Sequence, residues 1–262
     1  MQSPSIPLEP EMLARFADEL ADVTDAMAMS YFRKPLDVER KADQSPVTLA
    51  DRAIEAKMRE RIAQKFPAHG ILGEEHENTR LESAHIWVLD PIDGTKSFIS
   101  GMPTFGTLIA CLSDGAPELG VISIPPTGER WMGLHDKPTT LNGTPCHTSG
   151  RTRLADATLY TTTPDTFDAA GSGKFEALSG QVGMRRFGGD CYAYGLLASG
   201  HVDLVFEMGL HPYDYMALVP VIEGAGGVIT DWQGGPLGLH SDGHVIAAAS
   251  AALHQEALAA LS

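Results

Sequence analysis

The sequence predicts an α+β or layered α/β fold, in which two sheets lie between layers of helices. The order of the elements is the first observation behind this prediction: two helical segments come first, then a run of short strands, then a half in which strands and helices alternate. Composition is the second, because a chain of 262 residues with 43% hydrophobic content can bury a large core.

Periodic apolar residues and terminal signals predict the helices. In the first helix, apolar side chains recur every three or four positions from Leu13 to Met27, which turns one face inward. The second helix opens with Thr48 and, three residues later, Asp51, the pattern of a capping box. Pro220 should kink or shorten the helix that contains it. The predicted helices are residues 9–32, 47–67, 165–179, 190–199, 213–224 and 250–261.

Short apolar runs bounded by Gly, Pro and Asp predict the strands. We expect a single domain over residues 1–262 with two lobes, of about 1–148 and 149–262, because the segment 143–155 is polar and contains glycine. The predicted strands are residues 70–73, 85–90, 105–112, 119–125, 158–163 and 202–208.

The charge and cysteine content restrict the partners. A net charge of −15 argues against binding to nucleic acid or to an anionic membrane, but a metal site would still let a small phosphorylated substrate bind. We expect no signal peptide and no membrane span, since no basic start precedes an apolar stretch and no run approaches 18 apolar residues. Cys111, Cys146 and Cys191 show no CxxC spacing, which is typical of reduced thiols in a cytoplasmic protein.

Two aspartates end the apolar run at residues 85–90. Asp90 and Asp93 flank Pro91 and Ile92, and two carboxylates this close repel unless one is protonated or a cation lies between them. Mg²⁺ prefers such oxygen ligands, and the Ile92 carbonyl could add another. A bare DxxD pattern is more often a surface turn with a capping aspartate, so its surroundings decide between the two interpretations.

The next residues suit a bound anion. Gly94 lets the backbone approach a ligand closely, and if a short helix begins there, the amides of Gly94 and Thr95 would point at a phosphate. Two further acidic positions, Glu74 and Asp214, also follow apolar runs. Alone, Glu74 would be solvated and Asp214 would be an ordinary acid at a helix start. Together with the aspartate pair, they indicate one oxygen-rich pocket.

Longer segments carry a family resemblance. "GEE", "WVLDPIDGTKSF" and "PYDYMALVPVIEGAGGVITDW" together resemble the inositol-monophosphatase superfamily of Mg²⁺-dependent phosphatases, over the stretch from "SPVTLAD" at residue 45 to "GGVITDW" at 226. "DGTKSFISGMPTFGTLIA" is most similar to the histidinol-phosphate phosphatase branch. Lys96 and Ser97 stand where the usual inositol phosphatase has Thr-Asn, and Tyr213 stands where it has Trp.

The resemblance implies an αβαβα sandwich, usually in a homodimer, with two or three Mg²⁺ ions, or Mn²⁺, in each active site. It implies a phosphate-monoester hydrolase in which a metal-activated water attacks phosphorus. Thr95, with Asp51 behind it, would orient and deprotonate that water, although Asp51 also has its capping role. The implied metal ligands are Glu74, Asp90, the Ile92 carbonyl, Asp93 and Asp214.

The alcohol must be chosen by other residues. The resemblance places Glu207 against the leaving alcohol, with Asp190 as a second acidic contact and Arg186 as a contact for phosphate or carboxylate. L-histidinol carries an ammonium and an imidazole, so two acidic groups suit it. Asp190 could equally be a helix N-cap after Gly189.

We therefore expect a histidinol-phosphate phosphatase. The alternatives are an inositol monophosphatase or a broad sugar or nucleotide phosphatase, and, ranked last, a non-catalytic cation-binding module. The module would show damage at Thr95, Asp51 or Glu74, and all three are intact. The resemblance also implies inhibition by Li⁺. Ca²⁺ should inhibit as well, since it is larger and less demanding in geometry than Mg²⁺.

Overall fold

The computed structural model describes residues 9–35, 38–40 and 46–261. The segment 1–8, which includes the first half of the start used to argue against a signal peptide, lies outside these residues, as does Ser45. The helices are α1 Pro10–Tyr31, α2 Leu49–Lys65, α3 Thr95–Ser100, α4 Ala169–Ser179, α5 Asp190–Ala198, α6 Pro212–Tyr215, α7 Leu218–Gly224 and α8 Ala251–Ala260, with 3₁₀ helices at Leu154–Asp156 and Pro164–Thr166.

Within the described ranges, the strands form three sheets. A seven-stranded sheet has the order β3-β4-β5-β6-β7-β8-β9, a five-stranded sheet has the order β11-β10-β12-β14-β13, and β1 pairs with β2. Their bounds are β1 Val38–Arg40, β2 Pro46–Thr48, β3 Gly70–Gly73, β4 His85–Asp93, β5 Gly106–Ser113, β6 Ala116–Ile124, β7 Glu129–Leu134, β8 Thr140–Leu141, β9 Thr144–Pro145, β10 Thr158–Thr161, β11 Met184–Phe187, β12 Leu204–Glu207, β13 Val228–Thr230 and β14 Val245–Ala248.

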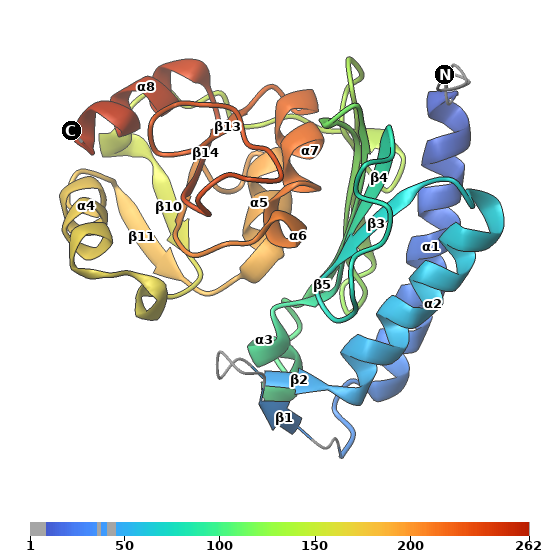
Figure 1. Ribbon diagram of the computed structural model, residues 1–262. Helices are drawn as coiled ribbons and strands as arrows, with labels where there is room; N and C mark the ends of the chain where they lie inside the picture. The colour runs from blue at the N-terminus through green and yellow to red at the C-terminus, as the bar shows by residue number, and fades with distance from the viewer. Residues whose placement is uncertain (1–8, 36–37, 41–45, 262) are drawn as a thin grey trace.

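Five layers stack in the order helix, sheet, helix, sheet, helix (Figure 1). Helices α1 and α2 cover one face of the seven-stranded sheet, α5, α6 and α7 lie between the two large sheets, and α4 and α8 cover the far side of the five-stranded sheet. Buried apolar side chains form one cluster beneath α1 and α2, one that spans both sides of the central helices, and one beneath α4 and α8. The expected layered α/β fold of αβαβα type is therefore confirmed.

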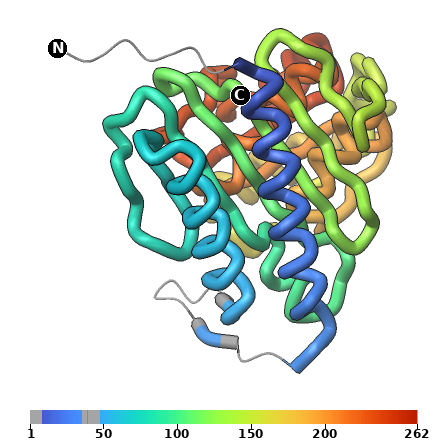
Figure 2. Tube along the Cα trace, turned by 90° about the vertical axis from the view of Figure 1, so that its right-hand side faces the viewer, coloured from blue at the N-terminus to red at the C-terminus, as the bar shows by residue number. Residues whose placement is uncertain are grey.

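The outer helices follow the predicted patterns. Helix α1 begins with Pro10 and buries Leu13 and Leu20 against α2 and the sheet, and the two helices lie side by side (Figure 2). The predicted capping box is present at α2, where the backbone N–H of Thr48 donates to Asp51 Oδ2 at 2.8 Å. Local signals were sufficient here because a cap and a periodic face need few distant contacts.

A β-bulge interrupts β4 at the DPID segment. Asp90 pairs with Leu108 and Asp93 with Gly106, so three steps along β4 face two steps along β5. Residues three apart would normally point to opposite faces of a sheet, and the extra residue brings both aspartates to the same side. Pro91 fits this position because it has no N–H to give to the ladder.

Two predicted helix boundaries need correction, and several strands were not predicted. The predicted helix 213–224 is split into α6 and α7, since Pro220 cannot donate the helical hydrogen bond to residue 216. The helix predicted from 165 begins at Ala169, because the Asp168 side chain caps it by accepting the Gly171 N–H at 2.7 Å. Short strands such as β7, β11 and β14 were missed. β11 pairs with β10 and β14 with β12, which lie far away in the sequence, whereas β7 forms a hairpin with the preceding strand β6.

The chain crosses from the first large sheet to the second between Pro145 and Leu154. One cluster of buried side chains nevertheless joins both halves, since Leu108 and Val205 both belong to it. We propose that the chain is one domain with two lobes that divide near residue 148. Among the helices of the described ranges, none combines the length and the apolar character needed to cross a bilayer.

Candidate active site

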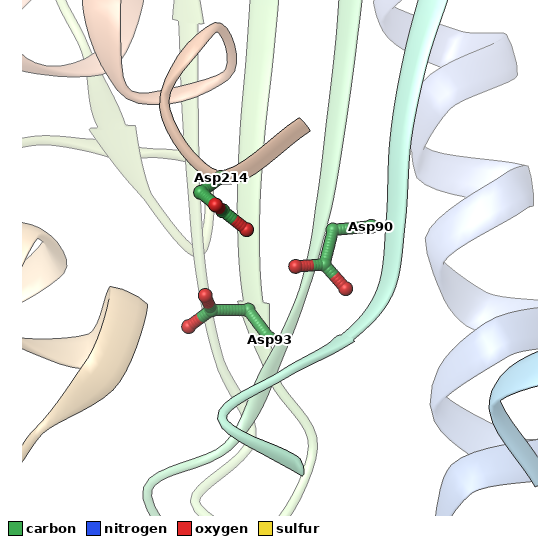
Figure 3. Close-up of side chains that lie close together, drawn as sticks. All are labelled: Asp90, Asp93 and Asp214. Atoms are coloured by element: carbon green, nitrogen blue, oxygen red, sulfur yellow. The ribbon is translucent and has the colours of Figure 1, made fainter. Parts of the chain in front are cut away.

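Three aspartates meet at the inner face of the seven-stranded sheet (Figure 3). Asp90 and Asp93 come from β4 and Asp214 from α6, and each offers a carboxylate oxygen within 4.8 Å of the other two. Asp90 is buried, and the other two are half-buried. Segments more than 120 positions apart in sequence thus contribute to one acidic cluster, which we call the aspartate cluster.

Backbone amides fix each of these carboxylates. Asp90 Oδ1 accepts the Ile92 N–H at 3.0 Å, Asp93 Oδ2 accepts the Cys191 N–H at 2.6 Å, and Asp214 Oδ2 accepts the His211 N–H at 2.6 Å. The side chains are therefore oriented before any ligand arrives, which is the arrangement a preformed site requires.

The electrostatics of the aspartate cluster favour a bound cation. Burial raises the pKa of Asp90 well above its usual value, and the charges of Glu74, Asp93 and Asp214 raise it further. Burial, and then the charge of Asp190, raise the pKa of Asp93 to about 7. A cation would relieve this repulsion, and a donor set made only of oxygens fits a hard divalent ion.

Glu74 approaches the cluster from the neighbouring strand. It follows β3, which pairs in parallel with β4. Its carboxylate forms a hydrogen bond with Asp90, and its negative charge raises the pKa of Asp90. The loop that carries Glu74 is held from α2. Glu55 Oε2 accepts the Glu75 N–H at 2.6 Å, and Glu55 Oε1 accepts a hydrogen bond from Arg59 Nε at 2.6 Å.

Arg59 holds the far side of the same loop. Its Nη1 and Nη2 groups donate to the carbonyls of Glu77 and His76, at 3.0 and 3.1 Å. Glu55 and Arg59 are not among the site residues predicted from the sequence. The sequence pattern that could have indicated Glu55 is its position one helical turn after Asp51, on the same face of α2.

Thr95 and Asp51 lie next to the cluster. Thr95 Oγ1 is 3.4 Å from Asp51 Oδ1 and 3.2 Å from the Ile92 carbonyl oxygen. Asp51 is fully buried and uses its other oxygen for the helix cap, so the two roles weighed for it in the sequence are compatible. Gly94 precedes Thr95 with a φ of 81°, a conformation that favours glycine.

Asp190 packs directly against the turn formed by Asp93, Gly94 and Thr95. Its carboxylate accepts a 2.6 Å hydrogen bond from the Ser97 hydroxyl, and a Cβ on Gly94 would lie 2.6 Å from Asp190 Cγ. The alternative interpretation of Asp190 as a helix N-cap is wrong. Gly189 is the N-cap and Asp190 is the first helical residue, with a left-handed φ of 47° that turns its side chain toward Ser97.

A cavity of about 140 Å³ opens beside the aspartate cluster. Asp93, Asp190, Asp214 and Glu207 all line it. Burial raises the pKa of Glu207 to about 7, and its oxygens accept hydrogen bonds from the Thr162 N–H and the Thr161 hydroxyl. The volume is below the roughly 300–1,000 Å³ of drug-sized pockets, so the cavity suits a small ligand.

Arg186 lies apart from this cavity. It is exposed on the edge strand β11, with its guanidinium 6.0 Å from the centre of the Tyr160 ring. A contact between Arg186 and a substrate therefore stays a prediction.

Comparisons with known proteins agree with the fold and the site. The sequence profile of the inositol monophosphatase family matches residues 9–262. The chain is 47% identical, over 272 aligned positions, to the bifunctional phosphatase IMPL2, chloroplastic, of Arabidopsis thaliana, and the match covers 99% of this chain and 78% of that protein.

Two further relatives bear on the activity. A histidinol-phosphatase of Chlorobaculum parvum is 36% identical, over 84% of this chain and 86% of its own length. The solved structure of an inositol monophosphatase from Zymomonas mobilis is 47% identical and superposes with a TM-score of 0.89, covering 97% of this chain and 99% of that one.

The layered fold, the aspartate cluster and the adjoining cavity define a metal-dependent phosphatase that acts on small phosphorylated substrates. The chain belongs to the inositol monophosphatase family, as its motifs predicted, and histidinol-phosphatases are among its relatives.

Proposed function

We propose that the chain hydrolyses L-histidinol phosphate to L-histidinol and phosphate with Mg²⁺. The observation that carries the proposal is the pair Asp190 and Glu207, two acidic side chains in a small cavity beside the aspartate cluster. A cationic alcohol is complementary to such a cavity, because it restores the ionised form of a glutamate whose pKa burial has raised to about 7. The histidinol-phosphatase relative supports the same substrate.

Each site residue then has a role. Bound metal ions, two or three of Mg²⁺ or else Mn²⁺, supply positive charge that stabilises the oxygens of the reacting phosphoryl group. Thr95 Oγ1 orients the attacking water and Asp51 Oδ1 accepts the proton. The amides of Gly94 and Thr95 donate to the phosphate. The residues that would hold the metal ions are Glu74, Asp90, Ile92 through its carbonyl, Asp93 and Asp214.

A second candidate is an inositol monophosphatase, which the 47% identity to the Zymomonas mobilis enzyme favours. Phosphate release with Mg²⁺ distinguishes the candidates on a panel of L-histidinol phosphate, inositol 1-phosphate, fructose 1,6-bisphosphate and 3′-phosphoadenosine 5′-phosphate. A strong preference for the first supports the proposal. Preference for the second supports the alternative, and equal rates on all four indicate a generalist.

We also propose a homodimer in the cytoplasm, inhibited by Li⁺ and Ca²⁺. Light scattering measures the mass in solution, and a monomer would contradict the dimer. Millimolar Li⁺ or Ca²⁺ that leaves turnover unchanged would contradict the inhibition.

A further inference from the structure

Tyr194 presents an unusual buried hydroxyl. The residue lies on α5, only 3% of its surface is exposed, and its ring belongs to the core between the two large sheets. No atom of the described residues forms a hydrogen bond with its hydroxyl. Buried hydroxyls normally have a partner, because an unpaired one loses its hydrogen bonds to water without replacement. The catalytic roles proposed above do not use Tyr194.

The substrate cavity lies beside Tyr194, whose hydroxyl oxygen is itself buried. Tyr194 lines this cavity together with Glu207, Asp93 and Asp214. Burial raises the pKa of the Tyr194 phenol well above its usual value, and the charges of the same three carboxylates raise it further. The phenol is therefore neutral near pH 7 and has one O–H to donate.

Glu207 complements this donor. Each of its oxygens accepts one hydrogen bond, from Thr162 N–H or the Thr161 hydroxyl, and a carboxylate oxygen has room for a second. The cavity thus pairs an O–H donor with a carboxylate acceptor. A group that carries an acceptor on one side and an N–H on the other satisfies both, and a neutral imidazole is such a group.

Building on the proposed function, we infer that Tyr194 is a specificity-determining residue, which donates its O–H to an acceptor on the alcohol part of the substrate while Glu207 accepts the N–H of the same group. The substrate class is a phosphate monoester whose alcohol bears a neutral imidazole. In this arrangement the hydroxyl faces the alcohol rather than the phosphate, so it distinguishes alcohols and leaves phosphoryl chemistry unchanged.

Tyr194→Phe tests this inference, because it removes only the hydroxyl and keeps the packed ring. kcat/KM for L-histidinol phosphate should fall about 10- to 100-fold, since the substrate acceptor is then buried without a partner. kcat/KM for phenyl phosphate, whose leaving group has no such acceptor, should stay within about twofold. Calorimetry should show weaker binding of L-histidinol, in the same proportion.

Tyr192→Phe is the matched control. Tyr192 lies on the same helix, and its hydroxyl donates to Glu129 at 2.7 Å, away from the cavity lining. Tyr192→Phe should leave kcat/KM unchanged for both substrates. If Tyr194→Phe lowers kcat/KM equally for both substrates, or lowers it for neither, the inference is overturned.

The same variant separates this inference from the proposed function. If the wild-type enzyme prefers another monoester of the panel, the histidinol-phosphate proposal fails. A loss of kcat/KM in Tyr194→Phe on that preferred monoester alone would keep the specificity role of the hydroxyl and overturn the imidazole assignment. If the wild-type rates are equal on all substrates and the variant loses no activity, both the proposed function and the inference on Tyr194 are overturned.

Discussion

Thr95 Oγ1 lies 3.4 Å from Asp51 Oδ1, although the two residues are 44 positions apart. Asp51 lies in the first turn of helix α2 and Thr95 begins α3, so the contact exists only because the start of α2 and the end of β4 lie together. One buried carboxylate thereby serves both a helix cap and a threonine at the candidate active site.

Asp51→Asn should separate these two roles. An asparagine oxygen can still accept the Thr48 N–H, so we expect the free energy of unfolding to fall by no more than about 1 kcal/mol. It cannot accept a proton, so turnover should fall about 10²- to 10⁴-fold. Ser250→Ala is the control, because it removes a remote helix cap at α8 and should cost similar stability without loss of turnover. Full turnover in Asp51→Asn would remove Asp51 from the mechanism.

Asp93→Asn should stabilise the metal-free protein while abolishing Mg²⁺-dependent phosphate release. The folded-state pKa of Asp93 is about 7, above the ordinary 3.8, so the folded protein holds a proton that the unfolded chain releases. The wild-type protein therefore loses stability relative to the variant as pH rises from about 4 to about 7, and the difference is constant above that range.

Thermal unfolding of the metal-free proteins at several pH values measures this effect. Asp165→Asn, a change at an exposed carboxylate, controls for net charge and should show no such trend. A stability difference that shrinks as pH rises would contradict the charge repulsion assigned to Asp93.

Arg59→Met should loosen the loop that carries Glu74. It leaves the fully buried Glu55 without its cation, so we expect a loss of about 3–5 kcal/mol in the free energy of unfolding. Metal affinity, measured by calorimetry, should fall about 10- to 100-fold because the Glu74 loop is no longer fixed. Arg61→Met, at an exposed position of the same helix, should change neither quantity. If Arg59→Met lowers the stability but leaves the metal affinity unchanged, the ion pair of Arg59 with Glu55 has only a structural role.

His69 should make the fold sensitive to acid. Its Nδ1 accepts the Trp87 indole N–H at 3.1 Å, while burial and the charge of His85 lower its pKa from 6.5 to about 4. The unfolded chain then binds a proton that the folded protein excludes, so the stabilisation is complete above about pH 6.5 and is lost as pH falls toward 4.

Comparison with His69→Gln isolates this effect, since glutamine can accept the indole N–H but does not titrate. The stability advantage of the wild-type protein over His69→Gln should shrink between pH 6.5 and 4. His240→Gln, at an exposed histidine, should follow the wild-type profile. An advantage that does not depend on pH would show that the pKa of His69 is the same in the folded and unfolded states.

The sequence by itself determined the local elements and the chemistry. The periodicity of α1, the Thr48–Asp51 cap and the apolar run before Asp90 each depend on neighbours within a few positions, so they could be predicted. The family motifs in addition indicated the layered fold and the acidic residue types that a phosphatase site needs.

Only the tertiary structure decided how those residues meet. The bulge in β4 brings Asp90 and Asp93 to one side, and it is defined by pairing with β5. The placement of Tyr194 beside Glu207, and of Arg59 beneath the Glu74 loop, depends on how helices pack against sheets. Local sequence sets backbone conformation through nearby hydrogen bonds and sterics, whereas contacts between distant segments are fixed by burial of the whole core.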